Sequence, residues 1–108
     1  MIRHIVMLEL AADAQADELA AVMDGLAALS SDIPGWIGFA HGPNRDFEGK
    51  SARYPYGFTC DFTDADALHR YAGDARHQAL GARLVGLCEG GAAGIMVIDL
   101  DTAAERSS

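Results

Sequence analysis

The sequence has few cysteines, few basic residues and no long apolar run, and each shortage excludes a class of protein. Its two cysteines, Cys60 and Cys88, form no Cys-x-x-Cys motif and are too few for a disulfide framework. We therefore expect reduced thiols in a cytoplasmic protein. No run approaches the roughly 18 apolar residues that a membrane span needs. Because Arg3, His4 and Glu9 interrupt the first strand-like segment, we expect no secretory leader either.

Basic residues are half as numerous as acidic ones, with 8 Lys and Arg against 16 Asp and Glu and a net charge of −8. Such a surface repels the phosphates of nucleic acid and of anionic lipid, so we expect neither as a partner. The four histidines form no His-x-His, His-x-x-x-His or His-Glu-x-x-His motif. A dedicated metal site is therefore not expected.

The 108 residues fit a single domain, and alternating apolar residues predict its strands. In residues 2–10, His4 shares one face with Ile, Val and Leu side chains, while the other face is mixed. Residues 54–62 alternate in the same way, with aromatic residues and Cys60 on one face and small or polar residues on the other. Further strands are expected at residues 36–42 and 94–100.

Three helices are expected between these strands. The first begins with Asp13 as its candidate cap and stops before Pro34. The second begins with a capping-box-like Thr63-x-x-Asp66 and breaks at Gly73. The third carries His77 and should end at Gly90-Gly91.

The predicted order is β-α-β-β-α-α-β, which becomes the ferredoxin-like βαββαβ unit when the last two helices count as one. The fold class is therefore α+β, with an antiparallel four-stranded sheet that carries helices on one face only. The opposite face still displays apolar side chains, which a monomer would leave in water. We therefore expect a homodimer that packs through its sheet faces.

His77 stands at the head of an apolar helix stripe that continues through Leu80, Leu84 and Leu87. An imidazole in a cavity walled by leucine can exchange a proton near neutral pH, which would make His77 a general base or acid. The ring could equally bond a backbone carbonyl and anchor the entry of the helix. Both interpretations stay open at this point.

Other candidates face the same side of the predicted sheet. His4, on an apolar strand face, is either a core residue or a second cavity residue close to His77. Tyr56 and Tyr71 each bring an apolar ring and a hydroxyl that could orient the oxygen of a ligand. Trp36 and Phe39 could wall the same space. Ordinary core packing remains the alternative for all four aromatic residues.

Several segments together resemble the stress-responsive A/B barrel (Dabb) domain family. They are "MIRHIVMLEL", "IPGWIGFAHGPN", "ALHRYAGDARHQAL" with its Tyr-x5-His-x-Ala core, and "IMVIDL". The resemblance covers about residues 1–100 and leaves residues 101–108 as a polar tail. It implies a dimeric α+β barrel whose protomers each enclose a cavity between sheet and helices.

In the cyclase branch of that family, a first-strand histidine and a histidine at the head of the last helix line the cavity, and the second is the base. By position these are His4 and His77, and the cavity tyrosine is Tyr71. Ala75 replaces a common proline, and Tyr56 stands where the third strand of a cyclase has a histidine.

The resemblance implies no cofactor and a small hydrophobic or aromatic ligand, acted on by proton transfer as in a cyclase, lyase or isomerase. The alternatives are a non-catalytic structural oligomer and, with less support, a monooxygenase of the same architecture.

Overall fold

The computed structural model describes residues 1–102 and confirms the predicted ferredoxin-like α+β fold. Its elements are β1 (Ile2–Leu8), α1 (Ala16–Ser30), β2 (Trp36–Pro43), β3 (Tyr56–Phe62), α2 (Ala65–Gly73), α3 (Ala75–Val85), the 3₁₀ helix η1 (Gly91–Gly94) and β4 (Ile95–Asp101). The predicted tail lies outside the described residues from position 103 onward. Asp101 still belongs to β4, and the backbone N–H of Thr102 donates to the Met1 carbonyl.

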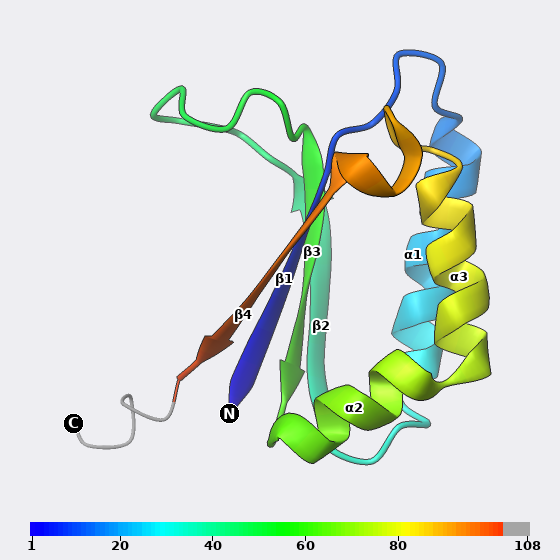
Figure 1. The fold of residues 1–108 in the computed structure, drawn as a ribbon, viewed down its shortest axis with the longest axis vertical. Helices are drawn as coiled ribbons and strands as arrows, with labels where there is room; N and C mark the ends of the chain where they lie inside the picture. Colours follow the sequence, from blue (N-terminus) through cyan, green and yellow to red (C-terminus); the bar gives the residue numbers. More distant parts are fainter. Residues whose placement is uncertain (103–108) are drawn as a thin grey trace.

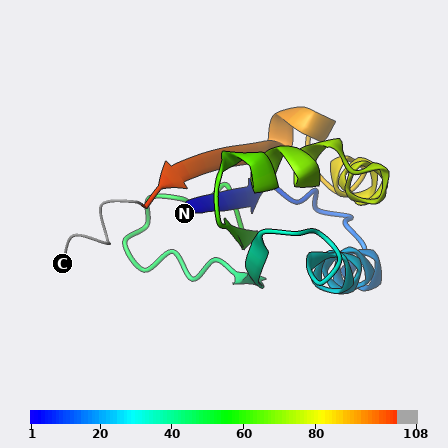
Figure 2. The same cartoon turned by 90° about the horizontal axis from the view of Figure 1, so that it is seen from below.

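The four strands form one antiparallel sheet in the order β2-β3-β1-β4. Strand β1 lies inside the sheet, where His4 stands opposite Cys60 on one side and Asp99 on the other. Helices α1 and α3 lie on one side of this sheet, and the loop between β2 and β3 projects on the other side (Figures 1 and 2). The two faces of the sheet therefore have different surroundings.

Alternation along the inner strands builds the core on the helix side. His4, Val6 and Leu8 of β1 all face the helices and are at most 7% exposed, as the sequence pattern predicted. They pack with buried residues of α1, β3 and the last two helices, among them Val22, Met23, Leu26, Phe58, Cys60, Phe62, Tyr71 and Leu84. Burial of this one face holds the helices against the sheet.

The predicted N-cap residues of the first two helices are wrong. Helix α1 begins at Ala16, and its N-cap residue Gln15 makes no side-chain cap bond, so Asp13 is not the cap. Helix α2 is capped by Asp64 rather than Thr63, because the Asp64 carboxylate accepts the backbone N–H of Ala67 at 2.9 Å. A carboxylate caps as well as a hydroxyl, so adjacent candidates compete for the same amide.

The helix that carries His77 is shorter than predicted. Helix α2 ends at Gly73 as expected, but α3 ends at Val85 rather than at Gly90-Gly91. The residues after it turn back so that Cys88 forms an isolated bridge with Leu10. None of the helices described over residues 1–102 is long and apolar enough to cross a membrane.

The face of the sheet away from the helices carries no helix, and its β1 and β4 half is mainly apolar. Arg3 and Asp61 form an ion pair at one end of this face. Ile5 and Met7 of β1 lie opposite Ile98 and Met96 of β4, and Leu100 continues the same row. Met96, Ile98 and Leu100 are 38%, 40% and 47% exposed. We call these five residues the apolar ridge.

Gly57 and Gly42 are cross-strand neighbours that differ in the space around them. A Cβ on Gly57 would lie 2.5 Å from the Met7 sulfur and 2.8 Å from the Val6 carbonyl oxygen, whereas a Cβ on Gly42 meets nothing within 4 Å. We expect Gly57→Ala to lower the free energy of unfolding by about 1–3 kcal/mol. We expect Gly42→Ala to leave it unchanged or slightly higher. Urea titrations test both, and two equally stable variants would contradict the close packing.

Candidate functional site

A cavity of about 450 Å³ lies under α2 and α3, against the β1 and β4 half of the sheet. Most of its wall is apolar, and its polar residues are histidines, a tyrosine and one carboxylate. The lining residues are His4, Val6, Phe58, Leu68, His69, Tyr71, Ala72, His77, Gly81, Leu84, Val85, Ile95, Val97 and Asp99. Three residues that the sequence singled out, His4, Tyr71 and His77, therefore share one cavity.

His4 is held by a carboxylate on the neighbouring strand. Its Nδ1 lies 2.6 Å from Oδ1 of Asp99, and the imidazole is 7% exposed. Because an ionised carboxylate only accepts hydrogen bonds, we assign the proton of this contact to Nδ1. Nε2 is then the nitrogen available to a ligand. Among residues 1–102 no group of three His, Cys, Asp or Glu side chains is placed to hold a metal ion.

Tyr71 stands between the two histidines. Its ring centroid lies 5.3 Å from that of His4 and 3.8 Å from that of His77. Burial raises the pKa of the Tyr71 hydroxyl well above its ordinary value, and the neighbouring Cys60 thiol adds to the shift. Burial likewise raises the pKa of Cys60 to about 12. Tyr71 therefore remains a neutral phenol, with its hydroxyl beside Cys60.

His77 combines partial burial with an unused hydrogen-bonding atom. Its Nδ1 is buried and has no hydrogen-bond partner, the one such side-chain atom found among the described residues. Burial lowers the pKa of His77 below 6.5; the Ala72 carbonyl opposes this shift, and His4 adds to it. His77 is thus a neutral imidazole at pH 7 that lines the cavity and has one buried nitrogen without a hydrogen-bond partner.

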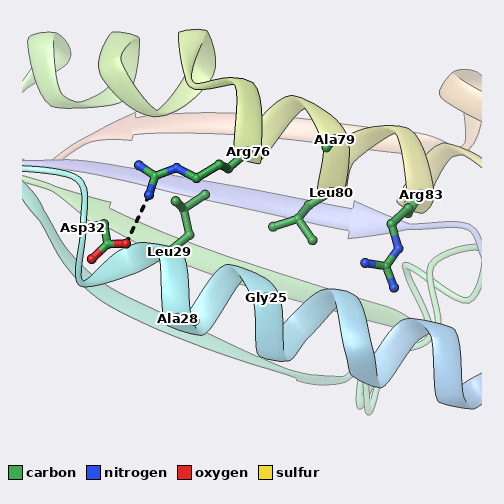
Figure 3. A pocket seen from close by; sticks show the side chains of 8 residues that line it. All are labelled: Gly25, Ala28, Leu29, Asp32, Arg76, Ala79, Leu80 and Arg83. Atoms are coloured by element: carbon green, nitrogen blue, oxygen red, sulfur yellow. Dashed lines mark hydrogen bonds and ion pairs between the residues drawn. The ribbon is translucent and has the colours of Figure 1, made fainter.

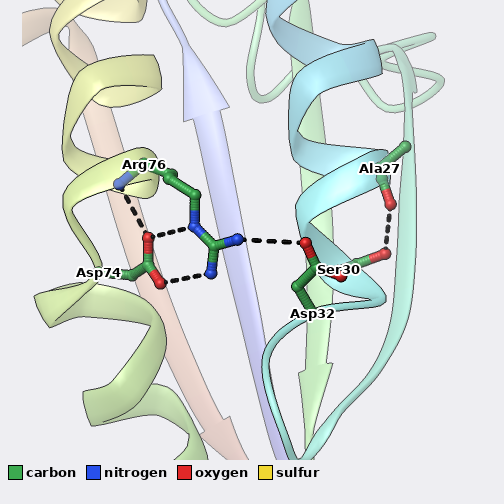
Figure 4. A network of polar contacts seen from close by, with 5 residues as sticks. All are labelled: Ala27, Ser30, Asp32, Asp74 and Arg76. Carbon is green, nitrogen blue, oxygen red and sulfur yellow. Dashed lines mark hydrogen bonds and ion pairs between the residues drawn. The ribbon is translucent and has the colours of Figure 1, made fainter.

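A network of charges holds the first turn of α3, and with it His77. The Asp74 carboxylate accepts the backbone N–H of Arg76 at 2.8 Å and binds the Arg76 guanidinium at 2.9 and 3.1 Å (Figure 4). The same guanidinium reaches Asp32, just beyond α1, at 3.1 Å. The bond from Arg76 lowers the pKa of Asp74 to about 2, so this cap stays ionised. His77 is one residue beyond Arg76.

Three predicted ligand contacts lie outside this cavity. Tyr56 is at the far end of β3, where its hydroxyl lies 2.6 Å from Nδ1 of His41. Trp36 is buried against Tyr71, with ring centroids 5.0 Å apart, and Phe39 packs beside Trp36. The structure places these three in or next to the aromatic core and does not bring them to the His4–His77 wall.

Asp99 and His69 are the cavity residues whose place the sequence did not indicate. Asp99 shares the alternation of Ile95 and Val97, which is the signal that could have placed it on the helix side of β4. Its pairing with His4 depends on the register between strands that are distant in sequence. His69 is exposed, as expected, yet it also lines the cavity.

A second hollow of about 420 Å³ lies between α1 and α3 (Figure 3). Its lining residues are Gly25, Ala28, Leu29, Asp32, Arg76, Ala79, Leu80 and Arg83. Both guanidinium groups are already engaged, Arg76 as described and Arg83 with the two Glu18 carboxylate oxygens at 2.6 and 2.9 Å. Because this hollow has no imidazole or unpaired acid, the histidine cavity is the better candidate site.

The fold and the cavity define a ferredoxin-like α+β protein with a histidine-lined internal site. The family model of the stress-responsive A/B barrel domain, Dabb, matches residues 2–102. The chain therefore belongs to the Dabb family, as the sequence motifs predicted. No curated protein matches the sequence.

Solved structures show where this fold recurs. A dimeric ferredoxin-like protein of unknown function from Jannaschia sp. CCS1 is 48% identical, with a TM-score of 0.90 over 94% of this chain and 98% of that one. Hydroxynitrile lyase from Passiflora edulis is 12% identical, with a TM-score of 0.76 over 92% and 90%. SnoaB, a cofactor-independent oxygenase from Streptomyces nogalater, is 16% identical, with a TM-score of 0.73 over 94% and 92%. At these low identities the two enzymes share the fold alone.

The lowered pKa of His77 predicts a pH dependence of stability. Between the folded pKa and 6.5 the unfolded chain binds more protons than the folded chain, so the free energy of unfolding falls as the pH is lowered through this window. It levels off below the folded pKa. A His77→Gln variant should lack this contribution. Urea titrations across the pH range, with NMR titration of the ring, test it; a folded pKa at or above 6.5 would contradict it.

Proposed function

We propose that this Dabb protein is a homodimer whose subunits each bind a small, mainly apolar ligand in the histidine cavity. The ligand would carry a carbonyl or phenol oxygen. The observation that carries the proposal is the buried Nδ1 of His77, a residue of the mainly apolar cavity wall, which has no hydrogen-bond partner. Leaving such an atom unpaired costs about 1–3 kcal/mol, a cost that a bound ligand with a polar atom would remove.

The chemistry that fits these residues is proton transfer without a cofactor. His77 would act as the base, since its lowered pKa keeps the imidazole neutral and ready to accept a proton. His4, whose Nδ1–H donates to Asp99, would have an unprotonated Nε2 in its neutral ring. That nitrogen would orient the ligand by accepting a hydrogen bond from a phenol hydroxyl. Tyr71 would separate the two imidazoles and shape the wall through its ring. The reaction class would be that of a cyclase, lyase or isomerase.

The apolar ridge supports the homodimer. Three exposed apolar side chains beside two partly exposed ones on one face of a small domain are typical of an association surface. A similar protein, 48% identical, is described as dimeric. A two-fold axis would cover the same face on both subunits at once.

A non-catalytic structural oligomer is the second candidate. The exposed ridge favours it equally, because assembly alone would explain that surface. A purely structural core, however, would be more stable with leucine or phenylalanine in place of an unpaired imidazole. The histidine cavity is therefore what separates the two functions.

Deuterium exchange tests the proton-transfer role of His77. We expect the protein to accelerate α-carbon exchange of acetophenone in D₂O beyond an equal concentration of imidazole. His77→Ala should lose this acceleration by about 10²-fold or more, because a positioned base contributes that much. NMR of the ketone methyl group measures the rate.

His41→Gln is the matched control, since His41 lies outside the cavity. The variant should exchange acetophenone at the same rate as the natural protein. A folded, dimeric His77→Ala protein with an unchanged rate would exclude His77 as the base. A His77→Ala protein that no longer folds would instead assign the ring a structural role.

A charge on the ridge tests the dimer. Ile98→Asp would bury a carboxylate between the two sheets, so we expect it to convert the dimer to a monomer in sedimentation velocity. Ala82→Asp adds the same charge to an exposed position of α3 and should leave the dimer intact. Equal sedimentation of the two variants would contradict a sheet-to-sheet interface.

A further inference from the structure

The loop between β2 and β3, residues 44–55, is a preformed arm. The Asn44 amide donates to the Ser51 and Tyr54 carbonyls at 3.3 and 2.9 Å. Oδ1 of Asp46 accepts the backbone N–H groups of Lys50 and Ser51, both at 2.9 Å. Arg53 ties the base of the arm to Glu9 at 3.0 Å. The arm therefore keeps its shape while it projects from the sheet on the side away from the helices (Figure 1).

This arm presents a phenylalanine to solvent. Phe47 is 88% exposed, and the guanidinium of Arg45 lies 5.6 Å from its ring. Because the backbone of the arm is already ordered, docking of the ring would cost little backbone entropy. The chemistry that suits it is an apolar notch with a carboxylate nearby.

The outer face of the sheet is uneven across its strands. The apolar ridge occupies the β1 and β4 half, whereas most of the β2 and β3 half is a trough of small side chains: Gly38, Ala40, Gly42, Gly57 and Thr59. At the end away from the arm, Asp61 lies beside Gly38 and forms an ion pair with Arg3. Two copies related by an axis parallel to the strands would place each ridge in the partner's trough. An axis across the strands would instead set ridge against ridge and leave the troughs empty, which close packing disfavours.

The first arrangement determines where the arm goes. It lays the β2 edge of one subunit over the β4 edge of its partner. Corresponding ends of the two sheets then lie over each other. The arm leaves the sheet at Pro43 and Tyr56. In the sheet, Tyr56 pairs with Leu8, and Leu8 pairs with Ile95, so the start of β4 lies at this same end of the sheet. It would therefore reach the partner's cavity, where Val97 and Val85 are 51% and 36% exposed.

We propose that Phe47 closes the histidine cavity of the partner subunit by packing between Val85 and Val97 at its mouth. Each site is then complete only in the dimer. The inference rests on the homodimer of the proposed function.

The area of the sheet face is consistent with this contact between subunits. Four strands of seven or eight residues give a flat face of roughly 450 Å² at ~4.8 Å spacing and ~3.3 Å rise. Stable interfaces bury ~800 Å² of accessible surface per partner, and the arms would add to the contact that the sheet faces supply.

Disulfide cross-linking tests the contact. We expect the Phe47→Cys/Val97→Cys double variant, oxidised with copper phenanthroline, to run mainly as a covalent dimer on a non-reducing gel. Native Cys60 and Cys88 are at most 7% exposed and should not react. Phe47→Cys/Ile37→Cys is the matched control, because Ile37 is 60% exposed but lies on the opposite edge strand, and it should stay uncross-linked.

Sedimentation velocity and the exchange assay distinguish failure of the arm contact from failure of the homodimer or of the His77 chemistry. A dimer in which the Phe47–Val97 pair fails to cross-link, or in which both pairs cross-link equally, overturns the arm contact and leaves the His77 chemistry standing. A monomer removes the homodimer and this inference together. Loss of exchange activity in Phe47→Ala, with the dimer retained, would further support closure of the cavity by the arm.

Discussion

Strand β1 faces the helices on one side and the open face of the sheet on the other, and the rest of the structure depends on this division. It lies inside the sheet, so its alternate side chains face opposite sides. One face, with Val6 and Leu8, anchors the core beneath the helices. The other face, with Ile5 and Met7, is part of a ridge that no helix covers. The same alternation therefore produces both one wall of the cavity and the exposed apolar ridge.

Burying the polar residues of the cavity lowers the stability of the fold compared with an apolar core. His4 has a hydrogen-bond partner in Asp99, and Tyr71 contacts both imidazole rings, but Nδ1 of His77 has no hydrogen-bond partner. The chain nevertheless secures the turn that carries His77 with the Asp74–Arg76–Asp32 network. A well-held imidazole with an unused nitrogen is what a proton-accepting site requires.

The sequence predicted those features that depend on local periodicity. The alternation of residues 2–10 placed His4 on the helix side, and the helix pattern placed Tyr71 and His77 toward the sheet, where the structure has them. Their role in a functional site stays a prediction. Asp99 was not predicted as the partner of His4, because cross-strand register is set by the whole sheet. Tyr56 faces the predicted side of β3 but lies too far along it to reach the cavity, a distance that periodicity does not encode.

Gly81 offers the most direct test of the claim that the cavity holds a ligand, since it lines the wall and a Cβ there meets nothing within 4 Å. Leucine at this position should fill the space without disturbing the fold. Native mass spectrometry of freshly purified protein should then show one small molecule per subunit in the natural chain and none in Gly81→Leu. Bare subunits in both proteins, or the same bound mass in both, would contradict a ligand site in the histidine cavity.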